Sequence, residues 1–322
     1  MIYSRIEGTG RYLPSKMMTN FDIEKLVDTS DEWIKTRTGV ERRHIAEAEQ
    51  ATSDLGYEAA KKAIESAGID KEEIDLIIIG TTTPDYIFPN TGTLIQDRLG
   101  IHGCPAFSVE AACSGFVYAL SVADKFIQTG GAKCALVIGA EVMTNLIDWS
   151  DRSTCVLFGD GAGAMILKPS NETGILDCKL GADGKYKDLL LYPAGPSKNF
   201  KKMGTGEVNL EMSGSDVFKV AVRTLGDAAE DALKVNNISK EELDWLVPHQ
   251  ANLRIIQATA KRLELPLEKV ILTVQDHGNT SSASIPMALD VGIRDGRIQR
   301  GHLVLMEAFG GGFTWGTVLM RY

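Results

Sequence analysis

Residues 69–80 read IDKEEIDLIIIG, and residues 238–249 read ISKEELDWLVPH. Five of these twelve positions are identical, and the offset between the two stretches is 238 − 69 = 169. The same offset relates two alanine-rich segments that lie upstream of them, in which Ala59, Ala60 and Ala63 return as Ala228, Ala229 and Ala232. Several matches in one register indicate an internal duplication, and this duplication decides the fold.

Each half of the chain carries the same succession of expected elements. The apolar patterns predict, in the first and second half respectively, a helix (54–67; 216–235), a strand (74–80; 243–248), a helix (91–99; 252–264), a helix (113–129; 281–296), a strand (134–140; 302–308) and a β-rich segment (156–168; 313–321). Strands that read as unbroken apolar runs are buried on both faces by helices. We expect an α/β fold of five layers, α/β/α/β/α, in which halves 1–172 and 173–322 form one compact duplicated unit.

The composition is that of an ordinary globular chain and excludes several classes of function. The 322 residues carry 34 Lys and Arg against 43 Asp and Glu, and this net charge of −9 argues against general nucleic-acid binding. The apolar runs are too short to span a membrane and no secretory signal is evident, so we expect a cytoplasmic protein. The five cysteines lack CxxC spacing, which argues against disulfides and metal sites: Cys104, Cys113, Cys134, Cys155 and Cys178.

Cys113 stands in the first turn of the expected helix 113–129, directly after a strand. Helix N-termini stabilise anions, so this position predicts a lowered thiol pKa and a candidate nucleophile. The alternative is a small buried core residue, which is the interpretation we favour for the other four cysteines.

Two polar positions of the second half converge on the same region. His249 follows the strand 243–248, and Asn279 precedes the helix that repeats the Cys113 helix, because 113 + 169 = 282. A lone histidine is more often structural, and Asn279 is equally suited to capping a helix. The repeat nevertheless brings Cys113, His249 and Asn279 to neighbouring strand and loop ends, and this combination is more informative than any member alone.

Glycines mark two further segments. Residues 309–316 (FGGGFTWG) permit close backbone approach and predict either a tight turn or an N–H donor to an oxyanion beside Cys113. Gly8 and Gly10 do not form a dinucleotide-binding fingerprint, because Leu13 stands where the third glycine is required. We interpret them as a turn or the start of a strand.

Six motifs in chain order resemble the thiolase superfamily, and specifically the β-ketoacyl-acyl-carrier-protein synthase III family. They are residues 31–39 (DEWIKTRTG), 111–116 (AACSGF), Asp151-Arg152, 249–252 (HQAN), 278–281 (GNTS) and the glycine-rich close. The resemblance implies a thiolase-like five-layered fold, a homodimer and a Cys113–His249–Asn279 triad. Asn279 stands where the elongating synthases have a second histidine, and no second cysteine stands where degradative thiolases carry one.

The resemblance also implies a reaction. An acyl-CoA, with acetyl-CoA expected, acylates Cys113, and malonyl-acyl carrier protein then loses CO₂ and attacks the acyl group, with no cofactor required. The N–H groups of Cys113 and Gly311 form the oxyanion hole. Residues matching the CoA site are Thr29, Trp33, Arg37, Arg152, Gly214, Phe218 and Asn252, and those matching the acyl pocket are Phe88 and Met143.

Acyl carrier proteins are acidic, so an acidic enzyme needs a local basic surface for docking. Arg254, Lys261 and Arg262 are spaced to share a helix face after His249, although the same pattern suits a solvated face. The full expected docking set is Lys219, Gln250, Ala251, Asn252, Leu253, Arg254, Lys261 and Arg262.

Rival interpretations remain open. A thiol hydrolase also uses Cys, His and Asn in this order, with the Asn orienting the His. Within the superfamily, a 3-hydroxy-3-methylglutaryl-CoA synthase or a secondary-metabolite condensing enzyme is possible.

Overall fold

Two β-sheets with the same strand order form the frame of the molecule. The computed structural model describes residues 2–322. The first sheet has the order β1-β7-β6-β4-β5, formed by β1 (Tyr3–Tyr12), β7 (Asp160–Ser170), β6 (Ala135–Val142), β4 (Leu76–Gly80) and β5 (Ala106–Val109). The second has the order β8-β13-β12-β11, formed by β8 (Ile175–Ala182), β13 (Thr314–Arg321), β12 (Leu303–Gly310) and β11 (Trp245–Pro248).

The duplication extends to the pairing register of the strands. Leu76 pairs with Ala135 in the first sheet, and Trp245 pairs with Val304 in the second, so that both members of the pair are shifted by the offset of the repeat. The counterpart of β5 is reduced to an isolated bridge between Leu246 and Val270. The expected boundary at residue 172 falls between β7 and β8.

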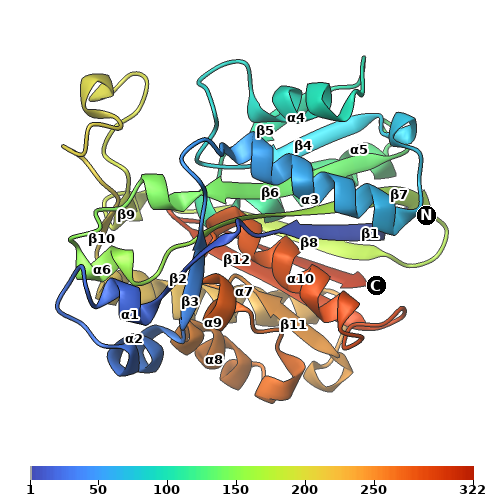
Figure 1. Cartoon of the computed structure of the whole chain (residues 1–322). Coiled ribbons are helices and arrows are strands. Elements are labelled where there is room, and N and C mark those ends of the chain that lie inside the picture. Colours follow the sequence, from blue (N-terminus) through green and yellow to red (C-terminus); the bar gives the residue numbers. More distant parts are fainter. Residues whose placement is uncertain (1) are drawn as a thin grey trace.

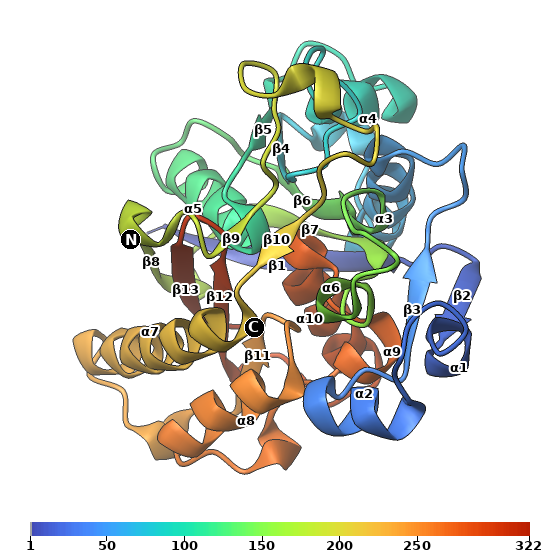
Figure 2. The same cartoon turned by 90° about the vertical axis from the view of Figure 1, so that its left-hand side faces the viewer.

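Six long helices complete the layers. They are α3 (Thr52–Ala67), α4 (Thr91–Leu99), α5 (Gly115–Gln128), α7 (Gly214–Val235), α8 (Leu253–Arg262) and α10 (Ser284–Arg294). Helices α5 and α10 contact both sheets, whereas α3 and α4 cover the outer face of the first sheet and α7 and α8 that of the second (Figures 1 and 2). The expected five-layered arrangement is confirmed. None of the helices of residues 2–322 is long and apolar enough to cross a membrane.

Strand β4 illustrates why the sheets lie between helices. Leu76 and Ile78 belong to the central apolar cluster with residues of α5 and α10, and Ile77 and Ile79 belong to the cluster under α3. Successive side chains of a strand point to opposite faces, so an unbroken apolar run fills two cores. Burying each such side chain stabilises the folded state by about 1.5–3 kcal/mol relative to leaving it exposed to water.

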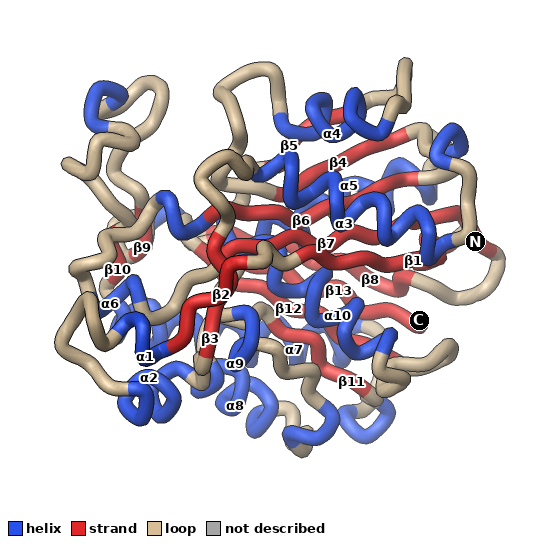
Figure 3. The backbone as a smooth tube through the Cα atoms, viewed as in Figure 1, coloured by secondary structure: helices blue, strands red, loops and turns tan. Residues whose placement is uncertain are grey.

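The remaining elements are short. The strands are β2 (Lys16–Thr19), β3 (Arg42–Ile45), β9 (Leu190–Leu191) and β10 (Glu211–Met212), and the α-helices are α1 (Asn20–Ile23), α2 (Asp31–Thr38), α6 (Arg152–Cys155) and α9 (Val274–His277). The 3₁₀ turns are η1 (Lys71–Glu73), η2 (Ala112–Ser114), η3 (Met143–Asn145), η4 (Gly184–Tyr186), η5 (Phe200–Lys202), η6 (Lys240–Glu242), η7 (Leu267–Lys269) and η8 (Ser281–Ala283). The segment between β9 and β10 is mostly loop and projects from the layers (Figure 3).

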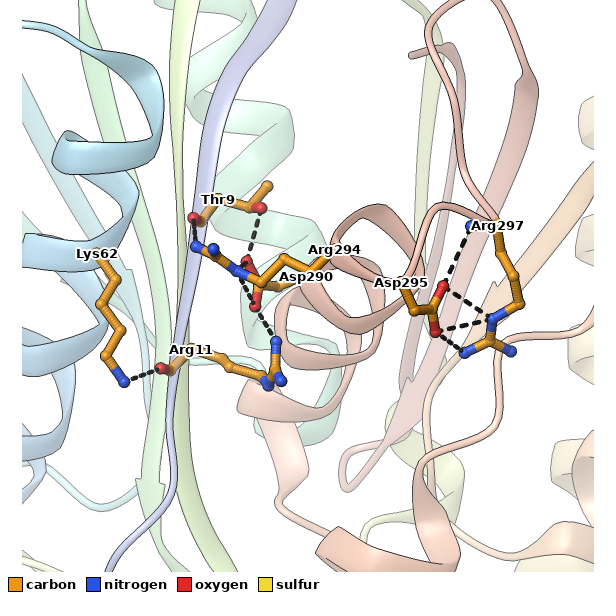
Figure 4. Close-up of polar contacts among 7 residues, drawn as sticks. All are labelled: Thr9, Arg11, Lys62, Asp290, Arg294, Asp295 and Arg297. Carbon is orange, nitrogen blue, oxygen red and sulfur yellow. Dashed lines mark hydrogen bonds and ion pairs between the residues drawn. The ribbon is translucent and has the colours of Figure 1, made fainter.

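A buried carboxylate links the two halves. Asp290 of α10 accepts hydrogen bonds from Thr9 Oγ1 of β1 at 2.8 Å and from Arg294 Nε at 2.8 Å, and it pairs with Arg11 (Figure 4). The Asp290 side chain is fully buried, and both of its oxygens have polar partners. This cluster fixes the central helix layer against the edge of the first sheet.

Candidate active site

One cavity of about 2070 Å³ brings the three predicted catalytic residues together. Cys113 of the first half and His249 and Asn279 of the second all line it. Helix and strand ends of both halves therefore meet at one site, as the duplication predicts.

The turn that carries Cys113 has an unusual backbone. Ala112, directly before Cys113, has φ +47°, and Ser281, its counterpart in the second half, has φ +50°. The left-handed region costs a non-glycine residue about 1–3 kcal/mol, and such strain is retained where the surrounding structure enforces it. The turns η2 and η8 therefore have the same strained, left-handed backbone at equivalent positions of the two halves.

The glycine-rich end of β12 lies directly against this turn. A Cβ atom at Gly310 would lie 2.6 Å from the backbone N of Cys113, a distance that no side chain permits. A Cβ atom at Gly311 would lie 3.6 Å from the Cβ of Ala112. Close backbone approach therefore explains Gly310, and Gly311 lies beside the nucleophile turn as an oxyanion donor requires.

Cys113 is a buried thiol rather than a stabilised thiolate. Burial raises the pKa of Cys113 to about 11, and the Ser281 hydroxyl, 3.5 Å from the sulfur, only partly offsets this. The predicted lowering of the pKa is therefore wrong for the free protein. Cys113 lies in η2, two residues before α5 begins, and the carboxylates of Glu141 and Glu110 also raise the pKa of the thiol.

His249 is held as a neutral imidazole. Its backbone N–H donates to Glu307 O at 2.7 Å, which places the residue at the end of β11. Burial lowers the pKa of His249 to about 4. The ring nitrogen Nδ1 is buried and has no hydrogen-bond partner within residues 2–322. At neutral pH the imidazole can therefore accept a proton at one nitrogen or donate from the other.

Asn279 is oriented by its own turn. Its backbone N–H donates to Leu157 O at 2.8 Å, and its backbone oxygen accepts from Gly159 N–H at 3.0 Å. The side-chain Oδ1 accepts from Ser281 N–H at 2.9 Å. A backbone N–H can only donate, so the side-chain atom that faces it must be the oxygen, Oδ1. The amide nitrogen, Nδ2, therefore stays available to donate a hydrogen bond to another group.

A buried carboxylate under the site was missed from sequence. Glu141, at the end of β6, accepts from Ser282 Oγ at 2.9 Å and Thr83 Oγ1 at 2.6 Å, and burial raises its pKa. Ser282 is the counterpart of Cys113, so the network connects the turn of the second half to strand ends of the first. The signal was available, because Thr81-Thr82-Thr83 and Glu141 directly follow or end buried strands.

Most of the predicted CoA residues line the cavity, namely Trp33, Arg37, Arg152, Gly214, Phe218 and Asn252. Thr29 does not. The Arg152 guanidinium lies 4.9 Å from the centroid of the Trp33 ring, an arrangement that stacks the two directly. A ring inserted between them would need a separation of about 7 Å, twice an ordinary contact distance, so no third ring fits between the two side chains at this separation.

The two predicted acyl-pocket residues also line the cavity but differ in environment. Met143 is buried in η3, whereas the Phe88 side chain is 83% exposed. Two further large apolar residues beside Phe88, Tyr86 and Ile87, are exposed as well. In a single chain, Phe88 lies at the rim of the cavity and leaves an apolar surface open.

The expected docking set divides into two groups. Lys219, Ala251, Asn252 and Arg254 line the cavity, and the Arg254 guanidinium lies 5.2 Å from the centroid of the Phe218 ring. Lys261 is exposed on α8. These five residues remain candidates for contact with a carrier protein.

Three members of the docking set are placed differently. Gln250 is 1% exposed, and its amide donates to Pro248 O and accepts from Thr273 N–H, so its assignment to the docking surface is wrong. Leu253 packs, half-buried, against Gly39. The Arg262 guanidinium is paired with two acids of α7, Asp227 and Glu230, so it is not the free cation that its spacing predicted.

Comparison with known proteins identifies the family of the chain. A family model described as "3-Oxoacyl-[acyl-carrier-protein (ACP)] synthase III" matches residues 107–184, and one for the C terminal part matches residues 233–322. The first contains Cys113, and the second contains His249 and Asn279. The chain is 62% identical to a Beta-ketoacyl-[acyl-carrier-protein] synthase III from Xanthomonas euvesicatoria pv. vesicatoria over 321 residues, covering 100% of this chain and 99% of that one. The chain belongs to the β-ketoacyl-acyl-carrier-protein synthase III family.

Solved structures of this synthase III family and of a related enzyme share the fold. A 3-oxoacyl-[acyl-carrier-protein] synthase III from Aquifex aeolicus matches with a TM-score of 0.93 at 48% identity, covering 99% of this chain and 100% of that one. The priming β-ketosynthase of the R1128 polyketide pathway matches with a TM-score of 0.94 at 38% identity, covering 99% and 96%. The expected thiolase-like fold is confirmed.

Proposed function

We propose that this protein condenses an acyl-CoA starter, acetyl-CoA in the simplest case, with malonyl-acyl carrier protein. The products are 3-oxoacyl-acyl carrier protein, CO₂ and CoA, and the reaction is the first condensation of type II fatty-acid biosynthesis. The observation that carries the proposal is the single cavity lined by Cys113, a neutral His249 and the donor side of Asn279, in a chain 62% identical to a synthase III.

The first half-reaction acylates the nucleophile. Because burial keeps Cys113 protonated, the thiol passes its proton to neutral His249 as the sulfur attacks the thioester carbonyl. The N–H groups of Cys113 and Gly311 hold the oxyanion. CoA leaves as a thiolate and takes the proton back from His249, so the acyl-enzyme retains a neutral imidazole.

The second half-reaction forms the carbon–carbon bond. Loss of CO₂ from the malonyl group leaves an enolate with its charge on the thioester oxygen. Neutral His249, in the tautomer that carries its proton on the nitrogen facing the cavity, and Asn279 Nδ2 each donate a hydrogen bond to that oxygen, where a carboxylate at position 279 would repel it. The enolate carbon attacks the acyl carbonyl on Cys113, and the sulfur leaves as a thiolate that takes up one proton from solvent, because the original thiol proton left with CoA.

The geometry favours condensation over thiol hydrolysis. In a Cys-His-Asn hydrolase the Asn oxygen accepts from the His ring and orients it. Here Asn279 Oδ1 accepts from Ser281 N–H instead, and Nδ1 of His249 has no partner within residues 2–322. The two side chains therefore stand as independent donors, an arrangement suited to an enolate oxygen.

The exposed Phe88 supports a homodimer as the working assembly. An 83% exposed phenylalanine beside Tyr86 and Ile87 is the kind of apolar patch that a partner subunit covers. We propose that Phe88 enters the acyl pocket of the second subunit, that the enzyme works in the cytoplasm, and that it needs no cofactor.

Intact mass spectrometry tests the proposed function. Wild-type protein incubated with acetyl-CoA gains one acetyl group and Cys113→Ala gains none, and addition of malonyl-acyl carrier protein then yields the 3-oxoacyl carrier protein. Release of acetate without carbon–carbon bond formation would establish a hydrolase instead. Equal activity with malonyl-CoA would favour a CoA-dependent condensing enzyme, the second candidate within the superfamily.

A further inference from the structure

The two proposed oxyanion donors belong to different halves of the chain. Cys113 N–H comes from η2, and Gly311 N–H comes from the turn between β12 and β13, near the C-terminal end of the chain. An oxyanion hole works only when its donors are held at a fixed spacing before the reaction begins. Some contact between these two segments must therefore set the distance.

One hydroxyl contacts both segments. Thr314, the first residue of β13, has its Oγ1 2.8 Å from Ala111 O, to which it donates, and 3.3 Å from Gly311 O, a longer polar contact. Ala111 lies two residues before Cys113, and Gly311 is the other donor residue itself.

The same residue receives a bond in return. Ser114 Oγ donates to Thr314 O at 3.1 Å, so Thr314 is connected to the residues on both sides of Cys113. Gly310 supplies the close backbone approach between these segments. The strained φ of Ala112 is thus held by contacts on both sides, and the Thr314 hydroxyl is the only side-chain donor to the Ala111 carbonyl among residues 2–322.

We propose that Thr314 is a positioning residue whose hydroxyl sets the spacing between the Cys113 and Gly311 N–H groups. The inference rests on the proposed function, because it presupposes acyl transfer through an oxyanion. Thr314 touches no substrate in this role and acts through the two backbone segments.

The expected effect follows from the role of the oxyanion hole. Complete loss of one donor costs about 10²–10³ in rate, and a small misplacement of a reacting group costs up to about 10². Thr314→Val keeps the shape of the side chain and removes the donor. We expect acetyl transfer from acetyl-CoA to Cys113 to fall about 10- to 100-fold in single-turnover measurements.

A second reaction of the same sulfur separates positioning from damage. Alkylation of Cys113 by iodoacetamide forms no oxyanion, so Thr314→Val should alkylate within about threefold of the wild-type rate while its acylation falls. Thr314→Ser restores the hydroxyl and should return acylation to within about threefold of wild type. Thr9→Val removes a buried hydroxyl bond of 2.8 Å at a residue that does not line the cavity, and it serves as the control for lost stability, with acylation unchanged.

The outcomes are distinguishable. Equal losses of acylation and alkylation in Thr314→Val would show general damage to the turn and overturn the inference, as would unchanged acylation or failure of the serine variant to recover. Absence of acylation in the wild-type protein would instead refute the proposed function.

Discussion

Glu307 is a buried acid whose ionisation should destabilise this protein. It lies on β12, where its side chain shares a face with Leu305 under α8, and it is fully buried. Neither carboxyl oxygen has a hydrogen-bond partner within residues 2–322. Burial raises the pKa of Glu307 from its ordinary 4.5 to about 8, and the nearby Thr259 hydroxyl opposes this only weakly.

The sign and size of the effect follow from proton linkage. Between pH 4.5 and 8 the folded protein retains a proton on Glu307 that the unfolded chain has lost, so stability falls as the pH rises through this window. Each unit of pH inside the window costs up to about 1.4 kcal/mol. The dependence on pH weakens near the pKa of the folded state, so the wild-type protein loses about 2 kcal/mol of unfolding free energy from pH 6 to pH 8.

The test compares wild type with Glu307→Gln, which keeps the shape and cannot ionise. Urea unfolding at pH 6, 7 and 8 and one protein concentration gives the difference in unfolding free energy between the two proteins, and contributions from other titrating groups cancel. We expect the unfolding free energy of the variant minus that of wild type to rise by about 2 kcal/mol between pH 6 and pH 8. Any effect of the substitution that does not depend on pH leaves this rise unchanged. A difference independent of pH, or one that shrinks as the pH rises, would refute a buried neutral acid at this position.

Three further predictions concern the site and its supports. Alkylation of Cys113 by iodoacetamide should accelerate about tenfold per pH unit between pH 7 and 10, because burial raises the pKa of its thiol to about 11, and a plateau below pH 8 would contradict this. Asp290→Ala should lower the free energy of unfolding by about 1–3 kcal/mol in urea titrations, because it removes the acceptor of the buried Thr9 hydroxyl, whereas the two arginines that it also pairs with are part-exposed and stay solvated. Arg254→Glu should raise KM for malonyl-acyl carrier protein about tenfold and leave acetyl-CoA loading almost unchanged, and equal loss of both half-reactions would oppose a docking role. Arg262→Gln is the control, because the charge of Arg262 is already paired with Asp227 and Glu230, and its removal should leave KM unchanged.

The fold was predictable where the chain repeats itself. Helix 54–67 is found at Thr52–Ala67 and helix 216–235 at Gly214–Val235, because both halves present the same apolar face to a sheet. Gly8 and Gly10, which we interpreted as a turn or the start of a strand, belong to strand β1. They lie inside the strand, where the backbone of α3 approaches so closely that a Cβ at Gly8 would meet Ala67 N at 2.4 Å.

The convergence of Cys113, His249 and Asn279 on one cavity was predictable, and the electrostatics of these residues were less so. Cys113, His249 and Asn279 lie at the ends of strands and helices. The order of these elements along the chain predicts that their ends meet, and so it predicts where the three residues converge. The pKa of the thiol depends on how completely the surrounding layers bury it, and the freedom of Arg262 depends on acids that lie on a different helix, α7, earlier in the chain. Burial and ion pairs of this kind arise from contacts between distant parts of the chain, so the spacing of residues along the sequence does not predict them.

The duplication also places two similar turns, η2 and η8, at the same site with different side chains. Ala112 and Ser281 adopt the same left-handed backbone, so each half directs the following residue toward the interface of the halves. In the first half that residue is Cys113, whose sulfur lines the cavity. In the second it is Ser282, whose hydroxyl lies within hydrogen-bond distance of Gly80 O and of Glu141, and so takes no part as a nucleophile. Two copies of one strained turn thus place Cys113 on the cavity in the first half and a hydrogen-bonded Ser282 in the second, and Asn279, two residues before Ser281, lines the same cavity.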